Sequence, residues 1–276
     1  MAGVAYNTNG FAHHRLEDAL AILADSGYDA VALTPDVHHL DPLRATPAEV
    51  AAIDATCRRL GLSVIVETGA RFVLDPARKH RPNLLDAPAE AARRLDFLCR
   101  CTDLGASLGA RIVSTWSGAL PEGVTPAQGW ERLVAGLRAL CEHAHRRGLR
   151  VAFEPEPGML VERAADWPRV RDAVGHPALG LALDVGHCLA MREGQPAAWV
   201  RQHAADLAVL QVDDHRTGVH DHLMLGEGEV DFGALRSALA ESGWRGPLEV
   251  ELSRHSASAP ATARACRAFL RERLGR

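Results

Sequence analysis

Short apolar segments alternate with longer amphipathic segments eight times along the chain, and this alternation limits the fold more than any other feature of the sequence. Each apolar segment is rich in Val, Ile, Leu and Ala and has the length of one β-strand. Near-continuous apolar runs of this kind are typical of parallel strands that are buried on both faces. The expected strands span residues 4–7, 30–34, 63–68, 111–116, 150–156, 180–185, 207–212 and 248–253.

The segments between these strands carry the start and stop signals of helices. Thr46-Pro47-Ala48-Glu49 is a capping box with proline at the first helical position, and the helix that follows is expected to end at Gly61. Eight strand–helix units predict an α/β fold, a single (β/α)8 TIM barrel over residues 1–276. A doubly wound open sheet is the alternative, but no glycine-rich phosphate fingerprint follows the first strand.

Charge and lysine content exclude some functions. The formal net charge is −4, which argues against nucleic acid as a partner, because non-specific affinity for it comes mainly from clustered Lys and Arg. The only lysine, Lys79, lies in a polar, proline-flanked segment and not on a strand. Schiff-base catalysis requires a desolvated lysine, so it is not expected here.

Cysteine spacing and hydropathy bear on the compartment. The six cysteines are scattered without a CxxC pair, which favours a reduced, cytoplasmic protein. No apolar run approaches the length of a membrane span, and no signal-peptide pattern opens the sequence, so no membrane association is expected.

Four consecutive strands end in polar residues: Glu154, Asp184, Gln211 and Glu251. The distance along the chain from each to the next is close to one strand–helix unit, so all four side chains are expected at one end of the barrel. Functional groups of this fold lie at the carboxyl ends of its strands. Three carboxylates with apolar neighbours are costly to bury unless they are paired or bind a metal. An oxygen-rich set suits Mn²⁺ or Mg²⁺, although Zn²⁺ or Co²⁺ could also bind.

Several segments of the second half resemble the xylose isomerase-like barrel superfamily. They are EPEPGM, LDVGH, HLMLGEGEVDF and VELSRH. That group contains ketose 3-epimerases, inosose isomerases and dehydratases, hydroxypyruvate isomerase and, more distantly, endonuclease IV. The resemblance implies one divalent metal ion held by Glu154, Asp184, Gln211 and Glu251. Gln211 stands where the family usually has His, and either its carbonyl oxygen is a ligand or His215 or a water takes that place.

The resemblance also implies substrate-binding residues. His187 resembles a histidine that binds a substrate hydroxyl, and Arg216 resembles a substrate-contacting arginine. Glu156 and His222 are expected beside the substrate, and Trp116, at the end of the fourth strand, could form an apolar wall. His220 and His222 match positions that hold additional zinc ions in endonuclease IV, but the early histidine ligands of that enzyme are missing here. A trinuclear zinc centre is therefore not expected.

Further polar candidates lie in the first half of the sequence. Asn7 and Asn9 end the first strand, and Glu67 and Arg71 end the third. The run Lys79-His80-Arg81 is interpreted in two ways. It could cover the barrel mouth and bind an acidic substrate, or it could be an exposed, solvated face.

These residues suggest a metal-dependent isomerase or epimerase of a sugar or cyclitol, with Glu154 and Glu251 as the catalytic acid and base. Two carboxylates flanking a metal-polarised substrate can remove and return a proton through an enediolate. The same enolate could expel a leaving group, which makes a dehydratase or other lyase the first alternative. A metal-dependent phosphodiester hydrolase and a non-catalytic barrel are the remaining ones. The expected partner is a small molecule; a homo-oligomer is compatible with the sequence.

Overall fold

A computed structural model describes residues 3–276 and contains a closed parallel eight-stranded barrel, as predicted. Neighbouring strands follow the sequence order, and β8 pairs with β1 to close the barrel. The strands are β1 (Val4–Asn7), β2 (Ala30–Leu33), β3 (Ser63–Val66), β4 (Ile112–Trp116), β5 (Arg150–Glu154), β6 (Leu179–Asp184), β7 (Leu207–Val212) and β8 (Leu248–Val250).

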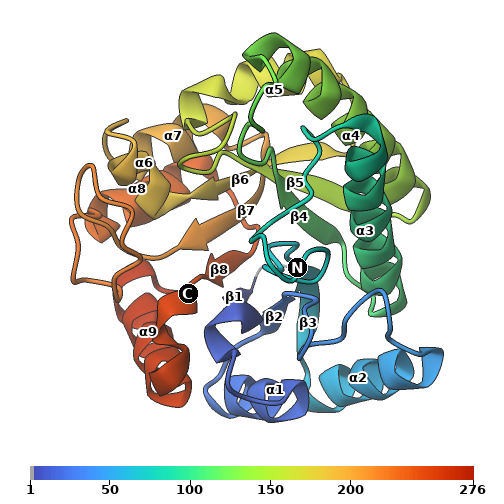
Figure 1. Cartoon of the computed structure of the whole chain (residues 1–276). Coiled ribbons are helices and arrows are strands. Elements are labelled where there is room, and N and C mark those ends of the chain that lie inside the picture. The colour runs from blue at the N-terminus through green and yellow to red at the C-terminus, as the bar shows by residue number, and fades with distance from the viewer. Residues whose placement is uncertain (1–2) are drawn as a thin grey trace.

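The helices form an outer ring around the strands (Figure 1). They are α1 (Leu16–Asp25), α2 (Pro47–Leu60), α3 (Pro88–Ser107), α4 (Pro126–Arg146), α5 (Trp167–Val174), α6 (Val185–Ala190), α7 (Pro196–His203), α8 (Phe232–Ser242) and α9 (Ala259–Leu274). The capping box at Thr46 is present, and α2 ends at Gly61 in the left-handed conformation that favours glycine. None of the helices within residues 3–276 is both long enough and apolar enough to cross a bilayer.

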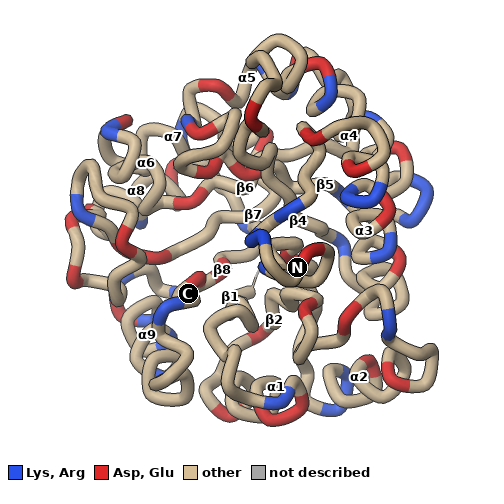
Figure 2. Tube along the Cα trace, viewed as in Figure 1, with Lys and Arg blue, Asp and Glu red and all other residues tan. Residues whose placement is uncertain are grey.

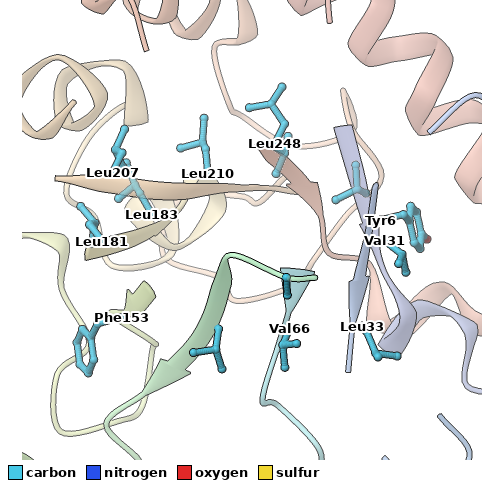
Figure 3. Close-up of a cluster of buried hydrophobic side chains, with 14 of the residues drawn as sticks. Tyr6, Val31, Leu33, Val66, Phe153, Leu181, Leu183, Leu207, Leu210 and Leu248 are labelled. Atoms are coloured by element: carbon cyan, nitrogen blue, oxygen red, sulfur yellow. The ribbon is translucent and has the colours of Figure 1, made fainter. Parts of the chain in front are cut away.

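Successive residues of a strand face opposite sides of the barrel wall, and the two sides differ in size and polarity. Outward-facing side chains such as Phe153 and Leu210 form the main core between strands and helices (Figure 3). Inward-facing side chains are small in the lower layers, where Ala152 and Ala182 lie in one interior cluster and Ala32 in another. The core therefore lies mainly between the strands and the helices.

The inward positions nearest the carboxyl ends of the strands are polar and buried. They include Asn7, Thr34, Glu67, Glu154, Asp184, Gln211 and Glu249. The longest loops at this end follow β3 and β7, and both contribute residues to the barrel mouth. The carboxyl-terminal end of the barrel is therefore polar and surrounded by loops.

Candidate active site

Glu154, Asp184 and Glu251 meet at the carboxyl ends of β5, β6 and β8. One carboxylate oxygen from each lies within 4.8 Å of the others. Glu154 and Asp184 are almost completely buried, and Gln211 on β7 has no exposed surface. The structure therefore brings together all four residues expected to hold a metal.

Asp184 is fixed by the start of α6. Its Oδ1 atom accepts hydrogen bonds from the backbone N–H groups of Gly186 at 2.7 Å and His187 at 2.9 Å, so it is the N-cap of this helix. Its Oδ2 atom is buried and has no hydrogen-bond partner among the described residues. One oxygen holds the side chain in place, and the other remains available as a ligand.

Gln211 and Asn9 position Glu251 from two sides. The Gln211 Nε2 atom donates to Glu251 Oε2 at 3.1 Å, and the Asn9 Nδ2 atom donates to Glu251 Oε1 at 2.9 Å. The Gln211 carbonyl oxygen Oε1 is buried without a partner in the described part of the chain. The amide therefore orients one carboxylate and leaves its own oxygen free.

Electrostatics at this position favour a cation. Burial, followed by the neighbouring Glu156 and Glu251 charges, raises the pKa of Glu154 well above its usual range. Burial and Asp213 likewise raise the pKa of Asp184. Converging carboxylates and two orphaned buried oxygens, Asp184 Oδ2 and Gln211 Oε1, form an all-oxygen set. Such a set fits a hard divalent cation.

A cavity of about 490 Å³ opens directly above these residues. Its walls come from the end of β4 and from the loops after β1, β3, β4, β5, β7 and β8. Glu154 and Glu251 form part of its floor, and Glu67 and Asn9 also reach it. Its volume suits a small-molecule ligand.

The structure brings three of the five expected substrate-binding residues to this cavity, namely Glu156, Trp116 and His222. His187 lies behind the wall, buried, with its Nδ1 atom 3.6 Å from Glu154 Oε1 and its Nε2 atom 3.7 Å from Glu156 Oε2. Arg216 is exposed and directed to Asp221, to which its Nε atom donates at 2.7 Å. Only a rearranged loop would bring the Arg216 guanidinium to the cavity.

An aspartate holds two imidazoles beside the cavity. Asp213 Oδ2 lies 2.6 Å from both His215 Nε2 and His222 Nδ1. Burial opposes the ionisation of Asp213, but the hydrogen bonds from the two rings outweigh it and hold its pKa well below the usual range. Burial would lower the pKa of His222, yet Asp213 raises it above that of a free histidine. Asp213 thus shifts the protonation equilibrium of this cavity-lining imidazole toward its charged form.

His220, by contrast, is neutral near neutral pH. Burial and the adjacent rings of His222 and His215 lower its pKa to about 4. Its ring centroid lies 4.5 Å from that of His222 and 4.9 Å from that of His187. The pKa values of His220 and His222 therefore shift in opposite directions, because His222 contacts Asp213 and His220 does not.

Gly186 allows the start of α6 to approach this histidine pair. A Cβ atom at Gly186 would collide with the ring of His215 and with Asp213 Oδ1. Glycine lets a backbone approach another group this closely because it has no side chain. The LDVGH segment therefore packs directly against the aspartate–histidine pair.

Glu249 is a buried carboxyl group that the sequence reading did not single out. It accepts a hydrogen bond from Asn7 Nδ2 at 3.1 Å, and burial with the nearby Glu251 raises its pKa well above the usual range. Glu249 and Glu251 are two residues apart on one strand, so both face inward. The two-residue spacing between Glu249 and Glu251 is the sequence pattern that could have identified Glu249 as an inward-facing residue.

Trp116 is supported by a stacked group of side chains from other elements. The guanidinium of the buried Arg94 lies 4.4 Å from the centroid of its ring, and the ring of His80 lies 5.1 Å away. Arg94 also donates to the carbonyl of Thr68 at 3.1 Å. The indole therefore forms a fixed wall of the cavity.

Comparison with known proteins identifies a matching family model and related enzymes. The family model described as xylose isomerase-like TIM barrel matches residues 20–273. A 3-dehydroshikimate dehydratase of Pseudomonas putida is 29% identical over 250 residues, which cover 86% of this chain and 36% of that protein. The chain thus spans about a third of the length of this relative. An L-ribulose 3-epimerase of Mesorhizobium japonicum is 25% identical over 248 residues, which cover 87% of this chain and 76% of that protein.

Solved structures share the fold at lower identity. The IOLI protein, solved with a binding zinc atom, has a TM-score of 0.80 and 16% identity, and the match covers 100% of this chain and 98% of that chain. This likeness concerns the fold alone. The family model, in contrast, spans almost the whole sequence, and the chain belongs to the xylose isomerase-like TIM barrel family.

Proposed function

We propose that this chain is a metal-dependent dehydratase that acts on a small polyhydroxylated ketone. Glu154, Asp184, Gln211 and Glu251 would hold one divalent cation, with Mn²⁺ or Mg²⁺ favoured by the all-oxygen set. When bound, the cation would polarise the substrate carbonyl and so acidify the adjacent C–H group. The relatives named above, a dehydratase and an epimerase, both support chemistry at a sugar-like or cyclitol-like substrate.

The carboxylates of this chain supply the base. Glu154 and Glu251 lie on strands three apart in the ring, and both reach the cavity. Either can accept a proton from carbon beside the carbonyl, provided that it is ionised. Because burial raises the pKa of Glu154, proton return from this residue is also favourable.

His222 is the observation that favours loss of water over epimerisation. A hydroxyl group leaves readily only when a proton reaches it, and an imidazolium ion can donate one. Asp213 holds His222 Nδ1 at 2.6 Å and raises the pKa of the ring, which lines the cavity. A pure epimerase needs only the two carboxylates and no acid of this kind.

A 3-epimerase is the second candidate. It is supported by the same pair, Glu154 and Glu251, because removal of a proton by one and return by the other inverts the carbon. The epimerase relative aligns over 76% of its own length. The two candidates share the proton abstraction and differ in the fate of the enediolate.

One experiment measures both proton abstraction and loss of water. The Mn²⁺-loaded protein is incubated in D₂O with keto-cyclitols and ketoses, while deuterium at the carbon beside the carbonyl is measured by NMR and enone formation by absorbance. A dehydratase gives an unsaturated product. His222→Gln should retain deuterium exchange but lose about 100-fold or more in water elimination, because the proton donor is missing.

The matched control is His13→Asn, which changes an exposed histidine outside the cavity and should leave both rates unchanged. Deuterated substrate of inverted configuration without loss of water would replace the dehydratase assignment by the epimerase. Absence of exchange with every ketone would contradict both assignments.

A further inference from the structure

Three cationic side chains converge on the rim of the active-site cavity. Arg71 and Lys79 come from the loop between β3 and α3, and Arg254 comes from the segment after β8. In Figure 2 most charged residues lie on the outer ring, and basic segments also occur near the centre of the view. The cationic rim, defined as Arg71, Lys79 and Arg254, lies over a floor of carboxylates.

The cationic rim does not neutralise that floor. Within residues 3–276, no carboxylate lies at ion-pairing distance from any of the three side chains. Arg254 uses its terminal nitrogens to donate to the carbonyls of His220 at 3.0 Å and Asp221 at 3.2 Å. The side chains of Arg71 and Lys79 have no hydrogen-bond partner in the same range.

Local structure holds these like charges together. The backbone N–H of His80 donates to the carbonyl of Arg71 at 2.7 Å, which closes the loop and brings Lys79 beside Arg71. Partial burial, followed by Arg71, lowers the pKa of Lys79. Burial and then Lys79 lower the pKa of His80 to about 3. Repulsion of this kind is unfavourable unless an anion joins the group.

Arg81 shows that the basic run is not simply a solvated face. Its Nη1 atom lies 3.1 Å from both carboxylate oxygens of Asp86, so Arg81 is neutralised and turned away. Lys79, two residues earlier, has no such partner and lines the cavity. The run therefore separates into one structural ion pair and one free cation at the mouth.

We propose that the cationic rim binds a carboxylate group of the substrate, so that the substrate is a keto-cyclitol acid or a similar keto acid. This inference rests on the proposed function and names its substrate class. A carboxylate on the rim would place the rest of a ring-sized molecule over Glu154 and Glu251. A phosphate is disfavoured because such groups are usually held by backbone N–H groups at a helix N-terminus, and no α-helix contributes to the lining within residues 3–276.

The test compares matched ligands on the Mn²⁺-loaded full chain by calorimetry. One ligand is a keto-cyclitol with a ring carboxylate, the second carries a hydroxymethyl group at that position, and the third carries a phosphate ester. The carboxylate should bind about tenfold or more tightly than the hydroxymethyl compound, because a charge-assisted hydrogen bond is lost. Lys79→Gln and Arg71→Gln should each weaken only the carboxylate ligand, by about tenfold.

Arg264→Gln removes a positive charge from the exposed face of α9 and serves as the charge-matched control, with no expected change. Equal affinity for the acid and its neutral analogue, tighter binding of the phosphate ester, or no binding of the acid would each overturn the carboxylate assignment. Deuterium exchange by the same ligands is scored separately. A protein that prefers the acid but exchanges no proton would retain the subsite and lose the proposed function.

Discussion

Gln211 lies where the resemblance to this family implies an imidazole, and its contacts suit an amide side chain. Its Nε2 atom orients Glu251, and its Oε1 atom has no partner in the described residues. A histidine cannot both donate to a carboxylate and offer an oxygen. The amide keeps the neighbouring carboxylate in place and, as a ligand in the proposed site, would favour harder cations.

Two replacements of Gln211 should have different effects, one on metal preference and the other on Mn²⁺ affinity. Gln211→His should favour Zn²⁺ over Mn²⁺ relative to the wild type, because imidazole suits Zn²⁺. Gln211→Leu should weaken Mn²⁺ binding by about tenfold or more, since it removes both the oxygen and the hydrogen bond to Glu251. Affinities are measured by competition with a chromophoric chelator. Gln202→Leu, on the exposed face of α7, is the control; unchanged Mn²⁺ affinity in Gln211→Leu would mean that Gln211 is not a ligand.

At the scale of single residues, the floor of the site could be predicted, but its upper wall only in part. Glu154, Asp184 and Gln211 end strands, and the alternation of side chains along a strand fixes which of them face inward. Arg216 lies in a loop and pairs with Asp221 instead of entering the cavity. No periodic sequence pattern predicts such a contact between loop residues. The same holds for Lys79 and Arg81.

Among the elements, the start of α6 has the strongest effect on the site. It caps Asp184 and packs against Asp213 and His215 through Gly186. Sequence alone indicated that Asp184 ends a strand, but not that Gly186 packs against His215 and Asp213. The close approach depends on two elements that meet only in the folded barrel.

Gly186→Ala should therefore destabilise the protein and disturb the metal site together. The added methyl group must displace His215 and Asp213, with an expected cost of about 1–3 kcal/mol in the free energy of unfolding. Denaturant unfolding measures this cost, and Mn²⁺ titration measures the second effect. Gly233→Ala in the first turn of α8 is a suitable control, because its Cβ atom would meet only Asp231 Oδ1 at 3.3 Å. Equal stability of the two variants would contradict the packing argument.

For the whole molecule, the predicted barrel was correct because the alternation of apolar segments extends over the entire sequence. All eight expected strands are present, with ends shifted by a few residues, as for β8, which stops at Val250. Loop conformation, in contrast, depends on isolated contacts such as the Arg71–His80 hydrogen bond. No repeated pattern encodes such contacts.

The buried carboxyl groups should make the stability of the metal-free protein depend on pH. Burial and Glu251 raise the pKa of Glu67 to about 7 and that of Glu156 to about 8, and burial raises the pKa of Glu249 well above its usual range. A group with a raised pKa in the folded state contributes stability below its unfolded value, 4.5 for Glu, and loses that contribution as pH rises through the folded value. The raised pKa of His222 acts in the same direction, because its contribution to stability is also lost as pH rises through the folded value.

The melting temperature of the metal-free protein should accordingly fall between pH 7 and pH 8.5, by an amount on the order of 5 °C. Saturating Mn²⁺ should reduce the fall, because the cation binds the ionised carboxylates and its affinity rises with pH. Thermal unfolding with and without Mn²⁺ measures both effects. Glu249→Gln should make the metal-free curve flatter. A melting temperature that rises over this interval would contradict the assigned protonation states.

Within residues 3–276, Asp184 Oδ2 and Gln211 Oε1 have no hydrogen-bond partner, which bears on how quickly the protein would acquire the proposed ion. Strands and a helix cap already hold these donors in place, so the chain needs little rearrangement when the ion arrives. The slow event then becomes the release of water from the ion itself. Loading rates should follow the order in which aqueous ions exchange their water, with Mg²⁺, which dehydrates reluctantly, slower than Mn²⁺.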